Sequence, residues 1–528
     1  MSGNLSRRNF IVGTAVGLTA LAGFRPFGLD FAEAATTNVK RGGVWKIAKN
    51  MTIPTLDVHL SNEYFASVGG IYECLLDTAI DPKTFEMKLV PMLAETWRFQ
   101  KEGKQLLFVL RKGIRFHDGT KFDAKAAKWN LDRVRSHPKS FLKFGMSKVE
   151  SIDVLNDNTI ALNCKEPMAS LPYALSTGQQ WAGMISPAFH EKNGDSGLAR
   201  EGCGTGPFQL KTWIVDEKVV VGRNKDYWRN GADGKPLPYL DGLEEHYRPE
   251  IDLAVVDLRS GNLDTVYAPA TRDYPTIKNH PDLAYVEMPP FELALPCIGF
   301  NSRKGPFASH PLRQAACYAL DRERFAKVMG FGIGRVHQYA RITKGDIGWA
   351  PEAWPDYSYN PQKAKDLVKK AYPNGVTVKL SIISREPDST LGEMIKANWD
   401  AVGINTEINA VERVQWIDTM RKDSFEASTW GSSTSMGGFV ENYLMSKAPA
   451  NWSKVSIPKV DQLMEKLSST LDAKMRHEIV QETLKNVFEA AELTCAYAYY
   501  AAVGTRKYVK GMRIAYRHIM PHEVWLDK

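Results

Sequence analysis

The stretch VTVKLSIISREPDSTLGEMIKANWDAVGINTEI, residues 376–408, decides the fold that this sequence predicts. Apolar and polar residues alternate over its first seven positions, which is typical of a strand. From about Thr390 apolar residues recur at helical spacing, and Gly403 is suited to end that helix. A second alternating run begins at Ile404. A strand, a helix and a second strand in this order predict a right-handed crossover between parallel strands, and hence an α/β fold.

Two loops are expected at the carboxyl ends of such strands, where ligands bind in open α/β sheets. The first, residues 384–387, carries Arg385, whose guanidinium suits a carboxylate or phosphate. A further strand, predicted at residues 425–430, runs into the second, a Ser/Gly-rich loop at residues 431–438. The candidate ligand contacts there are Trp430, Gly431, Ser432 and Ser433. Both loops could equally be ordinary surface loops, because exposed arginine and serine are common.

Length and composition restrict the class of protein. The chain has 528 residues, of which 44% are hydrophobic and 24% charged, as in ordinary globular proteins. At roughly 150 residues per domain, this length predicts two to four domains. The net charge of +8 is spread along the chain with acids and bases interleaved, so we expect no nucleic-acid groove. These values exclude a disordered, collagen-like or coiled-coil chain.

Six cysteines are scattered along the chain, at positions 74, 164, 203, 297, 317 and 495. None of them are spaced as C-x-x-C, and the spacing does not select a pairing. An oxidising compartment would permit disulfides. Disulfides and buried free thiols are therefore both left open.

Residues 1–34 have the pattern of an export signal. A twin-arginine pair, Arg7-Arg8, precedes an uncharged and mainly apolar stretch, and residues 32–34 form an A-x-A cleavage site. We predict cleavage after Ala34. No later run of apolar residues is long enough to span a membrane. The expected product is an exported, periplasmic protein.

Four groups of motifs, spread over nearly all of the remaining chain, match one protein family in order. They are LVPMLAETW (89–97) with LRKGIRFHDGT (110–120), GTGPF (204–208) with RNKDYW (223–228), FN (300–301) with PLRQA (311–315) and YALDR (318–322), and YNPQKA (359–364). By this ordered set the chain resembles the peptide/nickel-type family 5 of extracytoplasmic solute-binding proteins, the receptors of ABC importers. Each motif is weak alone, and the set indicates a family rather than one solute.

The resemblance implies an α/β, two-lobed periplasmic-binding-protein-like fold of the large class, which has an extra subdomain in lobe I. The chain is then expected to cross between the lobes twice, near residues 289–297 and 497–505. The expected organisation is lobe I at 35–292 with the subdomain inserted at about 80–200, lobe II at 293–500, and a C-terminal return to lobe I at 501–528.

The resemblance also implies ligand contacts in the second lobe. In peptide-binding relatives an arginine just after the equivalent strand pairs with the ligand carboxylate, and Arg385 matches that position. Relatives carry a Trp-x-Gly-Asp-like loop, whose aspartate holds the ligand's ammonium group. Here the four residues from Trp430 read Trp-Gly-Ser-Ser, without the acid. A buried ammonium without a carboxylate partner is costly. We therefore expect a solute that is anionic or neutral at that end, or a substitute acid such as Glu63.

An early loop lines the cleft in the same family, which makes Asn62, Glu63 and Tyr64 candidate ligand contacts. A solvated turn is the alternative for this loop. The rings of Tyr64 and Trp430 could stack on a solute. They could equally be core residues.

The function that we expect is binding without chemistry. The receptor would hold a peptide or other small organic solute and deliver it to ABC permease subunits, as a monomer, with no catalytic residue, cofactor, metal or nucleic acid. The glycine run at residues 330–334 follows a predicted helix, whereas a nucleotide fingerprint follows a strand. His117-Asp118 fits a turn, and His477-Glu478 lacks the second histidine of a zincin helix. The alternatives are a nickel or metal-complex receptor on the same fold, and a periplasmic hydrolase.

Overall fold

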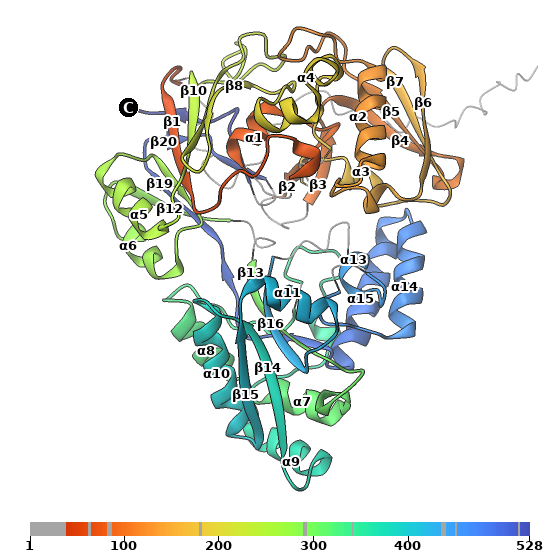
Figure 1. The fold of residues 1–528 in the computed structure, drawn as a ribbon, viewed down its shortest axis with the longest axis vertical. Coiled ribbons are helices and arrows are strands. Elements are labelled where there is room, and N and C mark those ends of the chain that lie inside the picture. Colours follow the sequence, from red (N-terminus) through yellow and green to blue (C-terminus); the bar gives the residue numbers. More distant parts are fainter. Residues whose placement is uncertain are drawn as a thin grey trace, which may run out of the picture.

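The chain forms two lobes stacked along the long axis of the molecule, as the computed structural model shows (Figure 1). The structure describes residues 38–61, 65–81, 87–178, 182–288, 293–340, 342–433, 440–448, 451–515 and 518–528. The upper lobe contains a seven-stranded and a four-stranded sheet, and the lower lobe contains a six-stranded sheet. Within these described ranges, no helix is both long enough and apolar enough to cross a membrane.

The seven-stranded sheet has helices on both faces. Its order is β12-β19-β11-β1-β10-β9-β8, and only β1 is parallel to its neighbours. Successive residues of a strand face opposite sides. Ile47 therefore joins the core under α1 (Ala66–Ile71), and Ala48 joins the core under α5 (Ile251–Ser260) and α6 (Tyr274–Lys278). The strands are β1 (Val44–Lys49), β8 (Phe208–Ile214), β9 (Lys218–Arg223), β10 (Gly242–Tyr247), β11 (Thr265–Tyr267), β12 (Leu283–Glu287) and β19 (Ala502–Arg506).

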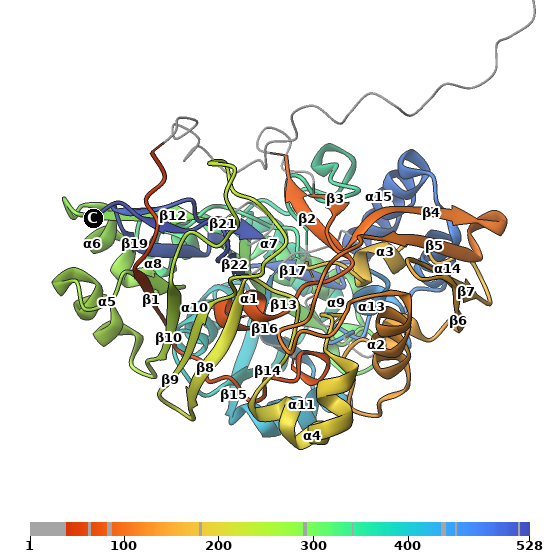
Figure 2. The same ribbon diagram turned by 90° about the horizontal axis from the view of Figure 1, so that it is seen from above.

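A four-stranded antiparallel sheet, in the order β4-β5-β7-β6, forms a separate unit of the upper lobe. Seen from above, it lies beside the seven-stranded sheet (Figure 2). Helix α2, which begins after the capping carboxylate of Asp123, packs against β6 and β7. The elements of this part are β2 (Leu76–Ile80), β3 (Met87–Pro91), β4 (Ala94–Gln100), β5 (Gln105–Leu110), α2 (Ala124–Ser136), β6 (Val149–Asn156), β7 (Thr159–Cys164), α3 (Leu171–Ala174) and α4 (Pro187–Arg200).

The six-stranded sheet of the lower lobe contains the predicted strand–helix–strand unit. Its order is β15-β14-β16-β13-β17, with β18 also paired to β13. β14 (Val376–Ile383) and β15 (Ile404–Val411) are parallel, with α10 (Asp388–Asp400) between them in the chain, which confirms the predicted parallel strands and the helix that joins them. The other strands are β13 (Leu293–Phe300), β16 (Ala427–Ser433), β17 (Leu493–Cys495) and β18 (Tyr499–Tyr500). The other helices are α7 (His310–Tyr318), α8 (Arg322–Met329), α9 (Pro361–Ala371), α11 (Arg413–Arg421), α13 (Glu441–Leu444), α14 (Pro458–Ser469) and α15 (Ala473–Glu489).

Strand β16 extends beyond its predicted end at residue 430. Residues 431–433, expected to begin a loop, lie on the strand and pair with residues 294–296 of β13. The prediction of a loop start was wrong there because glycine and serine favour turns over strands. Pairing with a neighbouring strand, which the local sequence does not show, overrides that preference.

Two stretches of chain pass between the lobes, and their described residues form the crossing segments: residues 286–288 and 293–294 lie antiparallel to residues 499–503. The chain leaves β12 for β13 on its way into the lower lobe, and it returns from β18 into β19. The Met288 N–H donates to the Ala501 carbonyl at 2.8 Å, and Leu293 lies opposite Tyr500. These crossing segments lie at the left of the boundary between the lobes in Figure 1. After β19 the chain ends in the upper lobe as β20 (Val509–Lys510), β21 (Arg513–Ala515), β22 (His518–Met520) and β23 (Trp525–Leu526).

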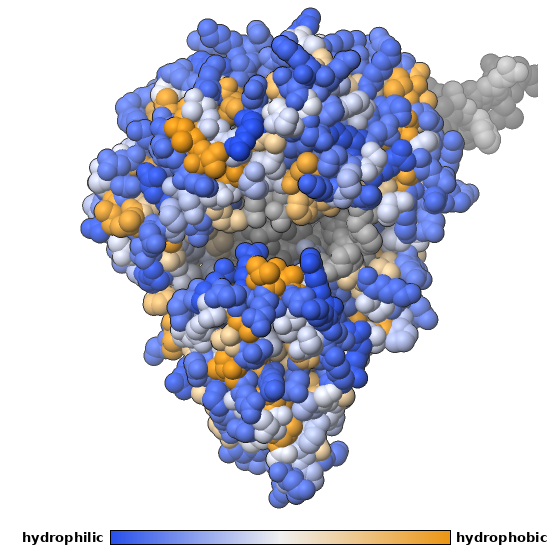
Figure 3. Space-filling model, viewed as in Figure 1, coloured by the Kyte–Doolittle hydropathy of each residue, from blue (hydrophilic) through white to orange (hydrophobic). Residues whose placement is uncertain are grey.

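The lobes also touch away from the crossing segments. The Ala169 N–H, just before α3 in the upper lobe, donates to the Ser468 carbonyl near the end of α14 at 3.1 Å. The Lys148 ammonium donates to the Ser468 hydroxyl at 3.4 Å. In Figure 1, α14 lies at the right, below α3 and across from the crossing segments. On the face seen in Figure 3, the surface is hollowed between the two lobes.

Gly299 of β13 allows the Trp430 ring of β16 to pack inside the lower lobe. A Cβ added at Gly299 would lie 2.3 Å from Cη2 of Trp430 and 2.6 Å from Cζ3. Trp430 is 4% exposed and belongs to the same core as Leu295 and Cys297. Gly431, one residue further along β16, differs, because a Cβ added there meets no heavy atom within 4 Å.

We predict that Gly299→Ala lowers the free energy of unfolding by about 1–3 kcal/mol, the usual cost of overpacking a core. Gly431→Ala is the matched control on the neighbouring strand, and we expect it to change the free energy of unfolding by less than about 0.5 kcal/mol. Denaturant unfolding followed by tryptophan fluorescence measures both values. Equal stability of the two variants would contradict the packing of Trp430 over Gly299.

Candidate functional site

Arg385 lies at the edge of the lower sheet that adjoins the upper lobe. β14 and β16 are parallel neighbours, so their carboxyl ends reach the same edge. β13 is antiparallel to β16 and begins at this edge, where the chain arrives from the upper lobe. The structure therefore brings Arg385, two residues after β14, to the same edge as Gly431 and the backbone of Ser432 and Ser433.

The Arg385 guanidinium is fixed on one side and exposed on the other. Its Nε donates to Oδ2 of Asp388 at 3.0 Å, and the Arg385 side chain is 57% exposed. The Ser384 N–H donates to the Val411 carbonyl, and the Ser389 N–H donates to the Arg385 carbonyl. These bonds tie the loop to β15 and to α10. A guanidinium held in this way can pair with a second anion through its terminal nitrogens.

Two stacked tyrosines lie close to Asp388. The ring centroids of Tyr497 and Tyr499 are 5.9 Å apart, with an angle of 22° between the rings. Burial, and after it the Asp388 carboxylate, raises the pKa of Tyr499. Tyr274 of α6, in the upper lobe, has a pKa raised first by burial and then by Tyr499. The Asp388 carboxylate therefore lies within electrostatic reach of the two stacked phenol groups.

The structure supports the core alternative for Trp430. Its ring is 4% exposed and packs against Gly299 in the core of the lower lobe, and its role as a ligand contact stays a prediction. Gly431 is exposed, and the space beside it is open. Ser432 and Ser433 are described only as backbone on β16. Asn62, Glu63 and Tyr64 lie outside the described residues.

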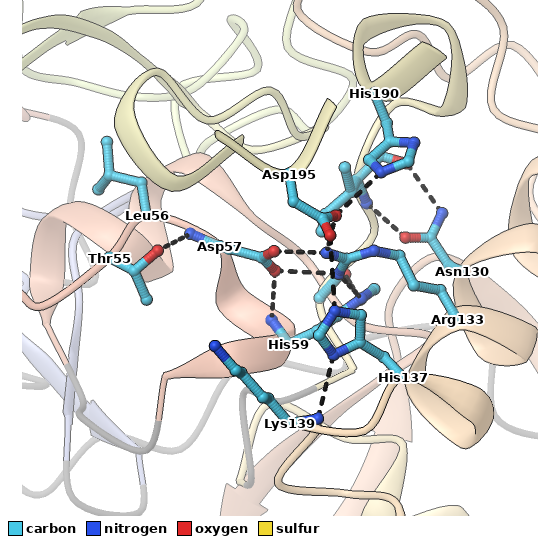
Figure 4. Close-up of polar contacts among 12 residues, drawn as sticks. Thr55, Leu56, Asp57, His59, Asn130, Arg133, His137, Lys139, His190 and Asp195 are labelled. Carbon is cyan, nitrogen blue, oxygen red and sulfur yellow. Dashed lines mark hydrogen bonds and ion pairs between the residues drawn. The ribbon is translucent and has the colours of Figure 1, made fainter. Parts of the chain in front are cut away.

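A buried ionic cluster lies just before residues 62–64 in the chain. Asp57, just before the short 3₁₀ helix Val58–Leu60, is fully buried, and its two oxygens accept from Arg133 of α2 at 3.0 and 2.5 Å. Arg133 also donates to Asp195 of α4 at 2.7 Å. Figure 4 shows the guanidinium in contact with both carboxylates. The cluster fixes the backbone at Asp57 to two helices of the upper lobe.

His59 joins this cluster as a neutral imidazole. Its Nδ1 lies 2.9 Å from Nη1 of Arg133, and its Nε2 lies 2.9 Å from the Gly183 carbonyl. Arginine only donates, so Nδ1 accepts and the proton sits on Nε2. A second proton, on Nδ1, would face the guanidinium. Burial lowers the pKa of His59 to about 4, and Arg133 adds to this effect.

A second buried carboxylate fixes the chain just after residues 62–64. Glu245 of β10 accepts from the backbone N–H groups of Ala66 at 3.3 Å and Ser67 at 2.8 Å, and from the Ser67 hydroxyl at 2.7 Å. These groups form the N-terminus of α1. Burial raises the pKa of Glu245. Sequence reasoning missed both anchors, because their partners are far apart in the chain and no motif joins them.

The structure supports a structural role for His117-Asp118 and for the glycine run at residues 330–334. His117 Nε2 lies 2.9 Å from the Gly206 carbonyl, and Asp118 accepts from the Thr120 N–H at 3.0 Å, as in a turn. The glycine run at residues 330–334 follows α8, as expected. Over the part of the chain that the structure describes, no group of three or more His, Cys, Asp or Glu residues could hold a metal ion.

Comparison with known proteins identifies the family. The family model "Bacterial extracellular solute-binding proteins, family 5 Middle" matches residues 88–454, more than half of the chain. This chain belongs to that family. Among curated proteins, the glutathione-binding protein GsiB of Pectobacterium atrosepticum is 26% identical over 396 residues, 73% of each chain. GsiB of Escherichia coli K12 is 28% identical over 335 residues, 62% of each chain.

Solved structures confirm the two-lobed fold of this family 5 protein. DppA from Helicobacter pylori in complex with the peptide STSA has a TM-score of 0.77 over 93% of this chain and 99% of its own, at 23% identity. NikZ from Campylobacter jejuni in complex with Ni(L-His) has a TM-score of 0.73 over 89% and 95%, at 19% identity. At these sequence identities, the likeness establishes a shared fold. By its family, the chain is a solute-binding protein of an ABC importer.

We predict that Arg133→Met lowers the free energy of unfolding by about 3–5 kcal/mol, because it leaves the buried Asp57 carboxylate without its cation. Lys128→Met is the matched control on the same helix. Lys128 is 40% exposed and pairs with Asp132 at the surface, so its loss should cost less than about 1 kcal/mol. Denaturant unfolding of the two variants tests this, and similar losses would contradict the dependence of the buried Asp57 carboxylate on Arg133.

We predict that the protein loses stability as the pH falls from 6.5 towards 4. The folded protein keeps His59 neutral down to about pH 4, whereas the unfolded chain protonates it near the ordinary pKa of 6.5. The unfolded state then binds more protons and is favoured, by about 3 kcal/mol for a shift of this size. His117 and His337, whose pKa values burial lowers to about 4, act in the same direction, and Glu245, whose pKa burial raises, acts in the opposite one.

Free energies of unfolding measured at stepped pH test the contribution of His59. A glutamine can replace the two hydrogen bonds of the neutral imidazole, because its side-chain carbonyl accepts and its amide donates. The His59→Gln variant should show a smaller loss between pH 6.5 and 4. A slope equal to that of the unmodified protein would remove His59 from the explanation.

Proposed function

We propose that this solute-binding protein captures a carboxylate-bearing, peptide-like solute between its lobes and releases it unchanged to ABC permease subunits. One observation carries the proposal: the exposed guanidinium of Arg385 lies at the edge of the lower sheet that adjoins the upper lobe. Recognition of an anion there needs no cofactor.

We propose the following organisation for capture: lobe I at residues 35–292 with a subdomain at about 80–200, lobe II at 293–500, and a return to lobe I at 501–528. The side-by-side crossing segments support these limits, because Leu293 lies opposite Tyr500 and Met288 bonds to Ala501. Two adjacent segments form a hinge about which the lobes can rotate as rigid bodies.

The protein works, in this proposal, in the periplasm as a monomer. The twin-arginine signal at residues 1–34, cleaved after Ala34, would direct a folded protein to export. These residues lie outside the described part of the chain, and the proposal rests on their sequence. Relatives include a protein described as periplasmic and associated with an ABC transporter.

The chemistry of the site favours a solute with a carboxylate at one end. The Nε–H of Arg385 donates to Asp388. The two terminal nitrogens of the guanidinium can bind a solute carboxylate bidentately. At the other end, the segment from Trp430 to Ser433 has no acid, so an ammonium group would need another partner, such as Glu63. Relatives are described as binding glutathione, a peptide and agropinic acid.

Closure follows from contacts that the solute makes with both lobes at once. A ligand shifts a conformational equilibrium only by its difference in affinity for the two states. The lobes already share the bonds of Ser468 to Ala169 and Lys148, and Arg335 of the lower lobe lies 3.6 Å from Glu287 of β12. A solute that bridges Arg385 and the upper lobe adds to these contacts only when the lobes are closed.

We predict that Arg385→Ala weakens binding of a carboxylate-bearing solute by at least ~1.5 kcal/mol, about tenfold, as for a charge-assisted hydrogen bond. Arg303→Ala is the matched control: Arg303 is 40% exposed and pairs with Asp423 at 2.7 Å, beyond the far end of β13. Mass spectrometry of solute copurified with the protein identifies the ligand, and calorimetry measures its affinity. Unchanged affinity would remove Arg385 from the site, and recovery of chemically altered solute would overturn the receptor function.

A further inference from the structure

Two cysteines lie directly opposite each other on neighbouring strands of the lower lobe. Cys297 on β13 is the register partner of Cys495 on β17. Both are fully buried, and both belong to the same core cluster, so their side chains lie on the same face of the sheet. The structure holds all six cysteines of the chain as thiols. Cys164, by contrast, lies opposite Val149 in its sheet.

The backbone bonds show which kind of strand pair the two cysteines form. The Ala496 N–H donates to the Pro296 carbonyl at 3.1 Å, so the pair next to the cysteines is hydrogen-bonded. The Cys495 N–H donates away from β13, to the Gln338 carbonyl at 3.2 Å. Cys297 and Cys495 are therefore a non-hydrogen-bonded antiparallel pair, in which the Cα atoms are about 4.5 Å apart. This lies within the range of about 4.4–6.8 Å that disulfides span.

We propose that Cys297 and Cys495 form a disulfide when the protein folds in the presence of a thiol–disulfide oxidant. The two thiols lose two protons and two electrons as the S–S bond forms, and the disulfide of the oxidant is reduced to two thiols. The Cys495 thiol donates to the Tyr497 carbonyl at 2.8 Å and must turn from it to reach Cys297. This rotation about one side-chain bond needs no change in strand register.

The burial of both thiols determines when the bond can form. Burial, and after it the neighbouring Cys297, raises the pKa of Cys495. A thiolate is the species that exchanges with disulfides, so the folded protein reacts slowly. The bond is therefore set during folding. A chain that is exported already folded, as proposed above, keeps both thiols until it unfolds and refolds where an oxidant is present.

The bond would close most of the lower lobe into one covalent loop. The chain between Cys297 and Cys495 includes the Arg385 loop and the other strands of this sheet that precede β17. The Met288–Ala501 bond and the Leu293–Tyr500 pair lie outside the loop, towards the upper lobe. The disulfide thus stabilises the lower lobe by restricting its unfolded state and leaves rotation of the lobes free.

Refolding the whole chain under defined redox conditions tests the proposal. Protein that is unfolded and fully reduced is refolded in glutathione disulfide with a small amount of glutathione, or in reductant alone, and remaining thiols are alkylated in denaturant. Peptide mapping should find Cys297 joined to Cys495 in the oxidised sample and both alkylated in the reduced one. The oxidised form should have a midpoint of thermal unfolding several degrees higher.

The main comparison uses the unmodified protein, so it does not require that any variant folds. Alkylation of both cysteines in the oxidised sample would overturn the proposal, and so would a bond from Cys495 to Cys317. Cys297→Ser should abolish the cross-link and leave Cys495 alkylated. Cys164→Ser is the matched control, and it should retain the cross-link and the shift in the unfolding midpoint.

Discussion

The antiparallel pairing of the two segments that connect the lobes is the constraint on which the rest of the structure depends. β13 carries the chain into the lower sheet between β16 and β17, and the return through β18 and β19 runs beside it. Since β14 and β16 are oriented opposite to β13, their carboxyl ends must lie where the chain enters. Loops after these strands therefore adjoin the upper lobe, because strand direction and not loop sequence determines where they emerge.

In the upper lobe, buried polar groups fix the position of the backbone. The Asp57–Arg133–Asp195 cluster and the Glu245 carboxylate hold the chain on either side of residues 62–64. Such groups are expensive to remove from water and contribute little net stability. They are directional, however, and they fix a backbone position more closely than apolar packing does.

The two halves of the candidate site differ in how well local sequence predicted them. Arg385 was found because a β-α-β pattern shows where a strand ends, and parallel strands put such ends at one edge. Trp430 was harder to interpret, since an aromatic residue beside glycines suits both a core and a binding loop. Only the pairing of β13 with β16, and the absence of a side chain at Gly299, decide that its ring is buried. The roles of the individual residues in binding stay predictions.

The sequence by itself determined the α/β class, the crossover at residues 376–408 and the family, because these depend on local periodicity and on motifs that are continuous in the chain. Only the tertiary structure decided that residues 431–433 lie on a strand, that Asp57 meets Arg133, and that Cys297 faces Cys495. Each of these joins segments that are far apart in sequence. Their contacts depend on how strands and helices pack, and local pattern carries no information about that packing.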